Sequence, residues 1–269
     1  MDQLRSWLWR MERKGIRVPE PEMIKSSRQV DGIRESGRVN TAVLDFLASC
    51  VTPGITTGEL DRLAYNETIR LGGRPAPLGF EGYPKSICTS VDSQACHGIP
   101  DDAVVLSEGS IVNLDVSTYY KGYYSDSSRT FLVGGVSREK ERLVREARNA
   151  MLKGVSKVRP FVYLGDVASA VWEHARKNGY EIASRIGGHG VGLAFHEKPF
   201  VPFVGRKGHG MLLVPGMVFT IEPVVNMGSG EVYHDEENGW TIYTRDGMPS
   251  AQWEVTVAVT KDGHEILSY

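Results

Sequence analysis

Cysteine is scarce in this chain of 269 residues, and the few cysteines form no recognisable pattern. Cys50, Cys88 and Cys96 include no Cys-x-x-Cys pair. An odd, sparse set argues against a disulfide scaffold and for a reducing compartment. We therefore expect a cytoplasmic protein.

Long apolar runs and strong net charge are also missing. No run approaches the roughly 20 apolar residues of a membrane span. The formal net charge is −2, so nothing in the overall balance indicates a stable nucleic-acid partner or a membrane. We expect a soluble monomer.

Residues 1–26 form a short N-terminal extension that ends near Pro19 and Pro21. Basic and apolar residues alternate over residues 1–14, unlike the continuous apolar core of a signal peptide. The pattern predicts an amphipathic helix packed on its own domain. A helix that binds a membrane surface or a partner stays open as the alternative.

The chain contains an internal repeat with a spacing of 107 residues. Residues 51–60 recur as residues 158–167, and residues 106–115 recur as residues 213–222. Each copy of the first pair follows an amphipathic helix and opens another. The first opening carries a capping box, Thr56 with Glu59. We therefore predict one α/β (α+β) domain over 27–269, with two pseudo-twofold-related halves at about 27–136 and 137–269.

Two acids, Asp115 and Asp126, stand on a predicted β-hairpin. If the turn is centred between Tyr120 and Lys121, the two acids face each other with Cβ atoms roughly 4.5–5.5 Å apart. Like charges so placed repel, and a divalent cation between them would offset the repulsion. A solvated hairpin with two unrelated acids is an open alternative from this feature alone.

Three more side chains complete a candidate metal cluster. The repeat places Glu222 where Asp115 stands in the first half. Glu254 lies in a strand pattern with valines on one face and Glu254 and Thr256 on the other, and a buried charge needs a partner. His189 lies in a glycine-rich segment that lets the backbone approach a site closely. The carboxylates and the imidazole suit two ions about 3.5–4 Å apart, of Mn, Fe, Co or Zn.

Two further histidines, His97 and His196, each lie in a compact turn-like segment beside an apolar side chain. The sequence pattern alone does not decide whether they function. His174 falls in a helical apolar stripe, and the remaining histidines are expected on surface loops.

With these residues assembled, the chain resembles the type I methionine aminopeptidases from about Ser27 to the C-terminus. The resemblance rests on separate strings whose joint order and spacing are specific: Gly82–Ser86, Cys96–Asp101, Val112–Val116, Gly188–Gly192, Phe219–Pro223 and Ala251–Glu254. Only 32 residues separate Glu222 from Glu254, which favours type I over the type II enzymes with their long insertion.

The resemblance implies the two-halved pita-bread fold, with a central, curved, mainly antiparallel sheet covered by helices. It implies a hydrolase that removes the initiator methionine from nascent chains with a small second residue, in transient proximity to the ribosome. Asp115 would bind one metal, and His189 and Glu222 the other. Asp126 and Glu254 would bridge both.

The resemblance also implies roles around the substrate. His97 would contact the scissile amide nitrogen, His196 the substrate carbonyl oxygen, and Glu222 would shuttle a proton. The methionine pocket would be formed by Phe80, Tyr83, Cys88, Phe195 and Trp240. Asp92 replaces an asparagine that often supports a monovalent-cation site, which argues against that site here.

Two rival functions stay open. A proline-specific aminopeptidase or dipeptidase shares the fold but usually carries a large extra N-terminal domain. A non-catalytic binding module of the same fold would have lost metal ligands, and this chain keeps all five.

Overall fold

The computed structural model describes residues 2–269. Five α-helices and two short 3₁₀ helices lie in this range. Their bounds are α1 Asp2–Glu12, η1 Pro21–Met23, α2 Ser27–Ala48, α3 Thr57–Arg70, η2 Phe80–Gly82, α4 Arg138–Val155 and α5 Leu164–Lys177.

Fifteen strands accompany the helices over the same residues. Their bounds are β1 Arg74–Pro75, β2 Cys88–Val91, β3 Gln94–Cys96, β4 Ile111–Tyr120, β5 Tyr123–Leu132, β6 Glu181–Ile182, β7 Gly188–Gly190, β8 Glu197–Val201, β9 Val218–Ile221, β10 Val224–Asn226, β11 Val232–His234, β12 Ile242–Thr244, β13 Ser250–Gln252, β14 Val255–Val259 and β15 His264–Ser268.

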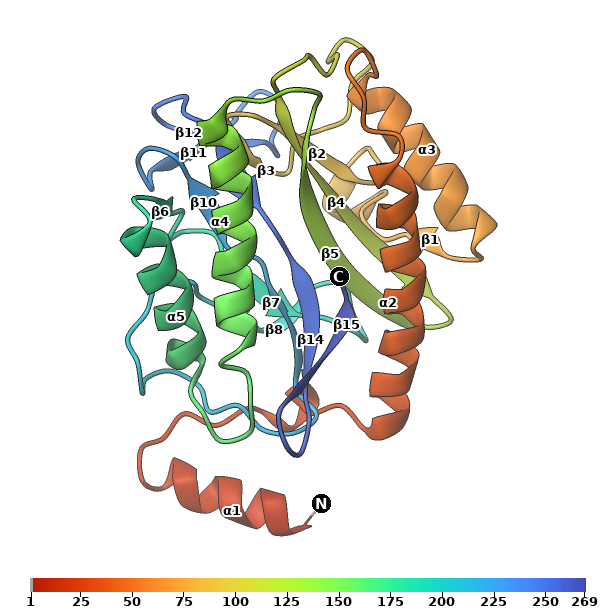
Figure 1. The fold of residues 1–269 in the computed structure, drawn as a ribbon. Helices are drawn as coiled ribbons and strands as arrows, with labels where there is room; N and C mark the ends of the chain where they lie inside the picture. Colours follow the sequence, from red (N-terminus) through yellow and green to blue (C-terminus); the bar gives the residue numbers. More distant parts are fainter. Residues whose placement is uncertain (1) are drawn as a thin grey trace.

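The strands pair in four antiparallel sheets. Strand β4 is flanked by β1, β2 and β5 in one sheet, and another has the order β15-β14-β9-β7-β8. Two three-stranded sheets, β13-β10-β6 and β11-β12-β3, complete the set. Figure 1 shows helices α2 and α3 on one side of the strands and α4 and α5 on the other. The mixture of helices and antiparallel sheets confirms the α/β fold class that the sequence predicted.

Backbone contacts of the first half recur in the second half, 107 residues further along the chain. Helices α3 and α5 begin at equivalent positions, and isolated β-bridges join Thr56 to Val105 and Tyr163 to Leu212. The capping box at Thr56 is present, since the Thr56 amide donates to Glu59 Oε2 at 2.9 Å and the Glu59 amide to Thr56 Oγ1 at 3.0 Å. The same local sequence thus builds the same turn twice.

Each half has its own hydrophobic core. In the first half, Val43 and Leu47 of α2 pack with Leu60 and with Leu114 of β4. In the second half, α4 and α5 pack against β9 and β14 through side chains such as Leu143, Val171, Phe219 and Val257. Burial of these apolar faces holds the helices against the sheets. The two halves then meet where β5 of the first half lies beside β14 of the second.

The hairpin of β4 and β5 corrects the register that the sequence predicted. The two turn residues are Lys121 and Gly122, and both have positive φ (48° and 95°), as a type I′ turn requires. Asp115 therefore pairs with Ser128, and Asp126 pairs with Ser117. The shift of two residues keeps both acids on one face, because strand side chains alternate with a period of two. The two acids are diagonal neighbours rather than a direct pair.

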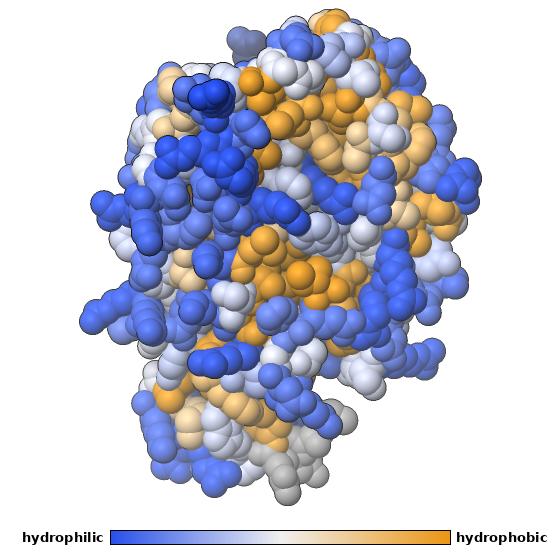
Figure 2. All heavy atoms as spheres, viewed as in Figure 1, coloured by the Kyte–Doolittle hydropathy of each residue, from blue (hydrophilic) through white to orange (hydrophobic). Residues whose placement is uncertain are grey.

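Helix α1 packs on its own domain, as the sequence predicted, and the structure shows that its contacts are with the second half of the chain. Leu8 is buried in the main core, and the Trp7 ring meets Phe161 edge to face with centroids 4.8 Å apart. In Figure 2, hydrophobic residues gather where α1 approaches the body, while the outer surfaces of α4 and α5 are mainly hydrophilic. Within residues 2–269, no helix has both the length and the apolarity to cross a membrane.

Candidate metal centre

All five predicted ligands come together where the two halves face each other. Asp115 and Asp126 project from the β4–β5 hairpin, and His189 projects from β7. Glu222 directly follows β9, and Glu254 lies in the break between β13 and β14 rather than inside a continuous strand. The Glu254 amide donates to Ser128 O at 2.9 Å, which ties this break to the hairpin.

The potential ligand atoms form three overlapping groups, and within each group they lie within 4.8 Å of one another. The groups are Asp115, Asp126 and Glu254; His189, Glu222 and Glu254; and Asp126, His189 and His196. Oxygen and imidazole donors of this kind suit divalent ions such as Mn, Fe, Co or Zn. Asp115 Oδ1 is buried and accepts no hydrogen bond, so this oxygen is free to bind a cation. The donor set therefore fits divalent metal.

The raised pKa values of the clustered carboxyls also indicate that a cation binds here. Burial, followed by repulsion from Asp126, raises the pKa of Asp115 well above its usual value. Burial likewise raises the pKa of Asp126 to about 7, that of Glu222 to about 8, and that of Glu254 well above its usual value. Four carboxylates cannot all ionise in such a small buried volume unless positive charge accompanies them.

Three polar residues that the sequence analysis did not identify orient the ligands. Thr220 Oγ1 donates to Glu222 Oε1 at 2.6 Å, and Gln252 Nε2 donates to Glu222 Oε2 at 3.2 Å. Ser117 Oγ donates to Asp126 Oδ1 at 2.8 Å. Such supporting contacts fix ligand orientation in metal sites. Ser117 lies two residues from Asp115, and Thr220 two residues from Glu222. The alternation of strand side chains could therefore have placed each of them on the same face as a ligand.

The glycines around His189 serve strand packing more than access to the site. A Cβ on Gly188 would meet the carbonyl and hydroxyl oxygens of Thr220, and one on Gly190 would meet the carbonyl of Lys198. Strand β7 can therefore lie close to β9 and β8 only because it lacks side chains at these two positions. This close approach places His189 Nε2 3.6 Å from Asp126 and 3.8 Å from Glu222.

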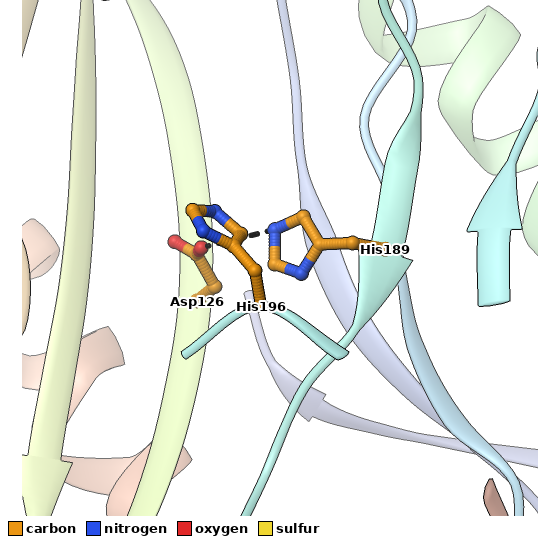
Figure 3. Close-up of side chains that lie close together, drawn as sticks. All are labelled: Asp126, His189 and His196. Carbon is orange, nitrogen blue, oxygen red and sulfur yellow. Dashed lines mark ion pairs between the residues drawn. The ribbon is translucent and has the colours of Figure 1, made fainter. Parts of the chain in front are cut away.

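His196 and His97 lie at the same site. Figure 3 shows His189 and His196 approaching Asp126 from β7 and from the segment that leads into β8. The rings of His189 and His196 lie 4.2 Å apart. His97 and His196 are both partly accessible to solvent, and both line the cavity that opens onto the cluster. Burial, then the nearby His189, lowers the pKa of each, so both are neutral at pH 7.

A cavity of about 260 Å³ opens onto the cluster. All five predicted pocket residues line it, which are Phe80, Tyr83, Cys88, Phe195 and Trp240. Pro77 and Ile186 also contribute to the wall. The ring centroids of Phe80 and Phe195 lie 4.9 Å apart, and those of Tyr83 and Trp240 lie 5.0 Å apart. Burial, then Asp115, raises the pKa of the Cys88 thiol well above its usual value, so the thiol is neutral and acts as an apolar wall.

Asp92, whose identity argued against a monovalent-cation site, already has a cationic partner. Lys140 Nζ donates to Asp92 Oδ1 at 2.6 Å and to Gly109 O at 2.8 Å. The same carboxylate oxygen accepts from the Ile111 amide at 3.1 Å. A lysine ammonium thus compensates the charge of this aspartate.

We expect the metal-free protein to lose stability as pH rises from 5 to 8. A carboxyl whose pKa is higher in the folded than in the unfolded state makes its most favourable contribution to stability while it is protonated in both states. This contribution is lost as pH rises from the unfolded pKa of about 4 to the folded pKa. Asp126 and Glu222, with values of about 7 and 8, define this window. Mn²⁺ should therefore raise the melting temperature more at pH 8 than at pH 5, as measured by thermal unfolding with and without chelator.

The Glu222→Gln variant is the control for this pH dependence, because its side chain cannot ionise. Its metal-free form should lose less stability over the same pH range. A melting-temperature gain from Mn²⁺ that is equal at pH 5 and pH 8 would contradict the assignment of these carboxylates to the metal.

Comparison with known proteins identifies the family of the chain. Metallopeptidase family M24 matches residues 31–261. Methionine aminopeptidase A of Synechocystis is 44% identical over 243 residues, which are 90% of this chain and 96% of the relative. The crystal structure of methionine aminopeptidase from Rickettsia prowazekii superposes with a TM-score of 0.90 at 41% identity, over 91% of this chain and 99% of that one.

A more distant structure shares the fold alone. The prolidase from Pyrococcus furiosus has a TM-score of 0.72 at 21% identity, and the match covers 92% of this chain but 65% of the prolidase. The matches over nearly full length are instead to methionine aminopeptidases. The chain belongs to metallopeptidase family M24, among the methionine aminopeptidases.

Proposed function

We propose that this protein hydrolyses the first peptide bond of polypeptides that begin with methionine and have a small second residue. Residues 27–269 form the single catalytic domain of this proposal, and residues 1–26 are an extension. The main observation in support of this function is the combination of a metal cluster and a cavity. A cluster of four carboxylates and His189 opens into a cavity of about 260 Å³ with aromatic and thiol walls. Such walls suit a flexible, polarizable thioether.

We assign the metal ligands from the three overlapping groups. Asp115 would bind one divalent ion, and His189 and Glu222 the other. Glu254 and Asp126 each lie in one group with Asp115 and in another with His189, and these two residues would bind both ions. Two divalent ions so held would supply hydroxide near neutral pH by lowering the pKa of water.

The histidines would contact the two polar groups of the scissile bond. His196, neutral at pH 7, would donate to the substrate carbonyl oxygen as negative charge develops on it. His97, also neutral, would accept a hydrogen bond from the scissile amide N–H. The lowered pKa of each ring keeps it from carrying a positive charge next to the metals.

Glu222 is the residue proposed to carry the proton to the leaving amine. Burial raises its pKa to about 8 in the metal-free protein. A bound cation would lower this pKa again, so the carboxylate would be ionised and able to accept a proton and pass it on. Thr220 and Gln252 donate to its two oxygens, and they would hold the carboxyl in one orientation during the transfer.

The rest of the biological setting belongs to the same proposal. The substrate would be the N-terminal methionine of nascent chains, which implies transient proximity to the ribosome in the cytosol. Three free cysteines, two of them buried, are typical of a reducing compartment. We propose that the protein acts as a monomer.

Hydrolysis of Met-Xaa-Ser peptides by the metal-reconstituted protein tests the proposal directly. We expect release of free methionine with Xaa as Gly, Ala or Ser, and rates that fall as Xaa becomes larger. Mn²⁺, Co²⁺, Fe²⁺ and Zn²⁺ should be compared, because availability as well as affinity selects the metal. Free methionine is measured by chromatography after short incubations.

Two outcomes would overturn the proposal in favour of its rivals. Exclusive cleavage of Xaa-Pro peptides would identify a proline-specific enzyme. A well-folded protein that binds no divalent ion and is inert toward all peptides would be a binding module.

A further inference from the structure

The sheet face that carries the metal cluster continues past it toward the hairpin turn. On β4, Asp115, Ser117 and Tyr119 share one face, because side chains alternate along a strand. Ser117 pairs with Asp126, and Tyr119 pairs with Tyr124 on β5. Strand β1 adds Arg74, which pairs with Tyr119 from the other side. One continuous face therefore runs from the acids to Arg74.

This continuation forms an open groove with a volume of about 350 Å³. Its lining includes Tyr65, Ile69, Arg74, Leu78, Tyr119 and Tyr124. Apolar surface is unusually accessible here, since Tyr65, Ile69 and Leu78 are 41%, 45% and 47% exposed. The groove thus combines accessible aromatic and aliphatic walls with one basic side chain.

Arg74 is the charged group of the groove. Its guanidinium lies over the Tyr119 ring, 4.6 Å from the centroid, and Tyr119 in turn packs against Tyr124 at 4.9 Å. A cation–π contact of this kind holds the guanidinium in place while leaving its N–H groups free to donate. Within residues 2–269, no carboxylate forms an ion pair with Arg74. A ligand of opposite charge would complete this site.

The groove and the metal cavity share a wall. The Tyr124 ring stacks on Phe195 with centroids 6.2 Å apart, and Phe195 stacks on His196 at 4.3 Å. Pro77 lines the metal cavity, while its neighbours Ala76 and Leu78 line the groove. A polypeptide whose N-terminus is bound at the metals can therefore extend from the metal cavity into the groove without leaving the protein surface.

The separation of the two sites matches the length of a few substrate residues. Tyr119 lies four residues along β4 from Asp115, a distance of roughly 13 Å at about 3.3 Å per residue. Arg74 pairs with Tyr119 from the neighbouring strand β1. An extended peptide covers about the same distance per residue. If its first residue is held at the metals, its fourth and fifth residues lie beside Arg74.

We propose that this groove binds the substrate chain beyond the cleaved bond, and that Arg74 selects acidic side chains at the fourth and fifth positions. The inference rests on the proposed function, because it requires a polypeptide whose N-terminus is held at the metals. It adds a preference for downstream sequence that the metal cavity cannot supply, since that cavity accommodates one side chain.

Paired peptides test this inference with the metal-loaded, full-length protein. The peptides are Met-Ala-Ser-Glu-Glu-amide and Met-Ala-Ser-Lys-Lys-amide, whose amidated ends remove the terminal carboxylate. We expect kcat/KM to be about fivefold higher for the acidic peptide, as for one exposed ion pair. Arg74→Glu should reverse the order of the two peptides. Each ratio is taken within one variant, so a general loss of folding or metal cancels.

Arg70→Glu is the matched control. Arg70 is an exposed arginine on α3 that pairs with Glu67, and it is not among the groove residues. This variant should keep the wild-type ratio. A ratio that does not respond to Arg74→Glu, or that responds equally to Arg70→Glu, would overturn the inference.

The tripeptide Met-Ala-Ser separates the two hypotheses. If the wild-type protein cleaves it but shows no preference between the longer peptides, only the groove assignment fails. If the wild-type protein does not cleave it under any metal condition, the proposed function fails and the groove assignment fails with it.

Discussion

Asp126→Asn is expected to remove most of the bound divalent metal and to lower kcat/KM by more than about 100-fold. Asp126 belongs to a ligand group with Asp115 and Glu254, and it also lies within 4.8 Å of His189 and His196. It therefore touches both parts of the cluster. Loss of a residue that only supports a ligand already costs about 10–100-fold, and an amide at this position carries no charge to offset two cations.

Metal content by plasma emission spectroscopy and hydrolysis of Met-Ala-Ser measure this effect together. Asp31→Asn is the matched control, because Asp31 is an exposed aspartate on α2 paired with Arg34. It should retain full metal and activity. An Asp126→Asn protein that binds two equivalents of Mn²⁺ and turns over normally would show that Asp126 is not a bridging ligand.

His196→Ala is expected to lower kcat by about 10²–10³-fold, the cost of losing one donor to a developing oxyanion. The fold and most of the metal should remain, because the five predicted ligands stay in place. KM should change less than kcat if the hydrogen bond strengthens chiefly in the transition state. His196→Gln keeps a donor near the same position and should recover part of the lost rate.

Steady-state kinetics and metal analysis of the same preparations test this expectation. His209→Ala is the control, since His209 is an exposed histidine in a loop away from the cluster. If His196→Ala instead lost its metal, the close grouping of His196 with Asp126 and His189 would identify it as a ligand. Full activity with metal present would remove His196 from the mechanism.

The β4–β5 hairpin shows how far local patterns determine a site. The alternation of side chains correctly placed Asp115 and Asp126 on one face. The exact pairing was wrong by two residues, because the turn sits at Lys121 and Gly122, where both residues have positive φ. A glycine in the second turn position was the available signal. The error did not alter the site, because a shift of two residues conserves the face.

The repeat was the most informative long-range signal in the sequence. It related Asp115 to Glu222, and the structure repeats the same bridges and turns in both halves. Glu254 was harder to place from its alternating pattern, since it lies in a break between two strands and is aligned by a backbone contact to Ser128. Gln252 was missed because its contact with Glu222 joins segments 30 residues apart, and Thr220 was missed although its spacing from Glu222 places it on the same strand face.

The sequence by itself determined the repeated half, the face of each strand and the acid and imidazole groups available for metal. These follow from spacing within one element, where the periods of helix and strand are set by backbone geometry. Only the tertiary structure decided which acids share a group, where the supporting hydrogen bonds lie, and that an aromatic groove with Arg74 continues from the cavity. Those distances join segments far apart in the chain, and the packing of the two halves against each other sets them.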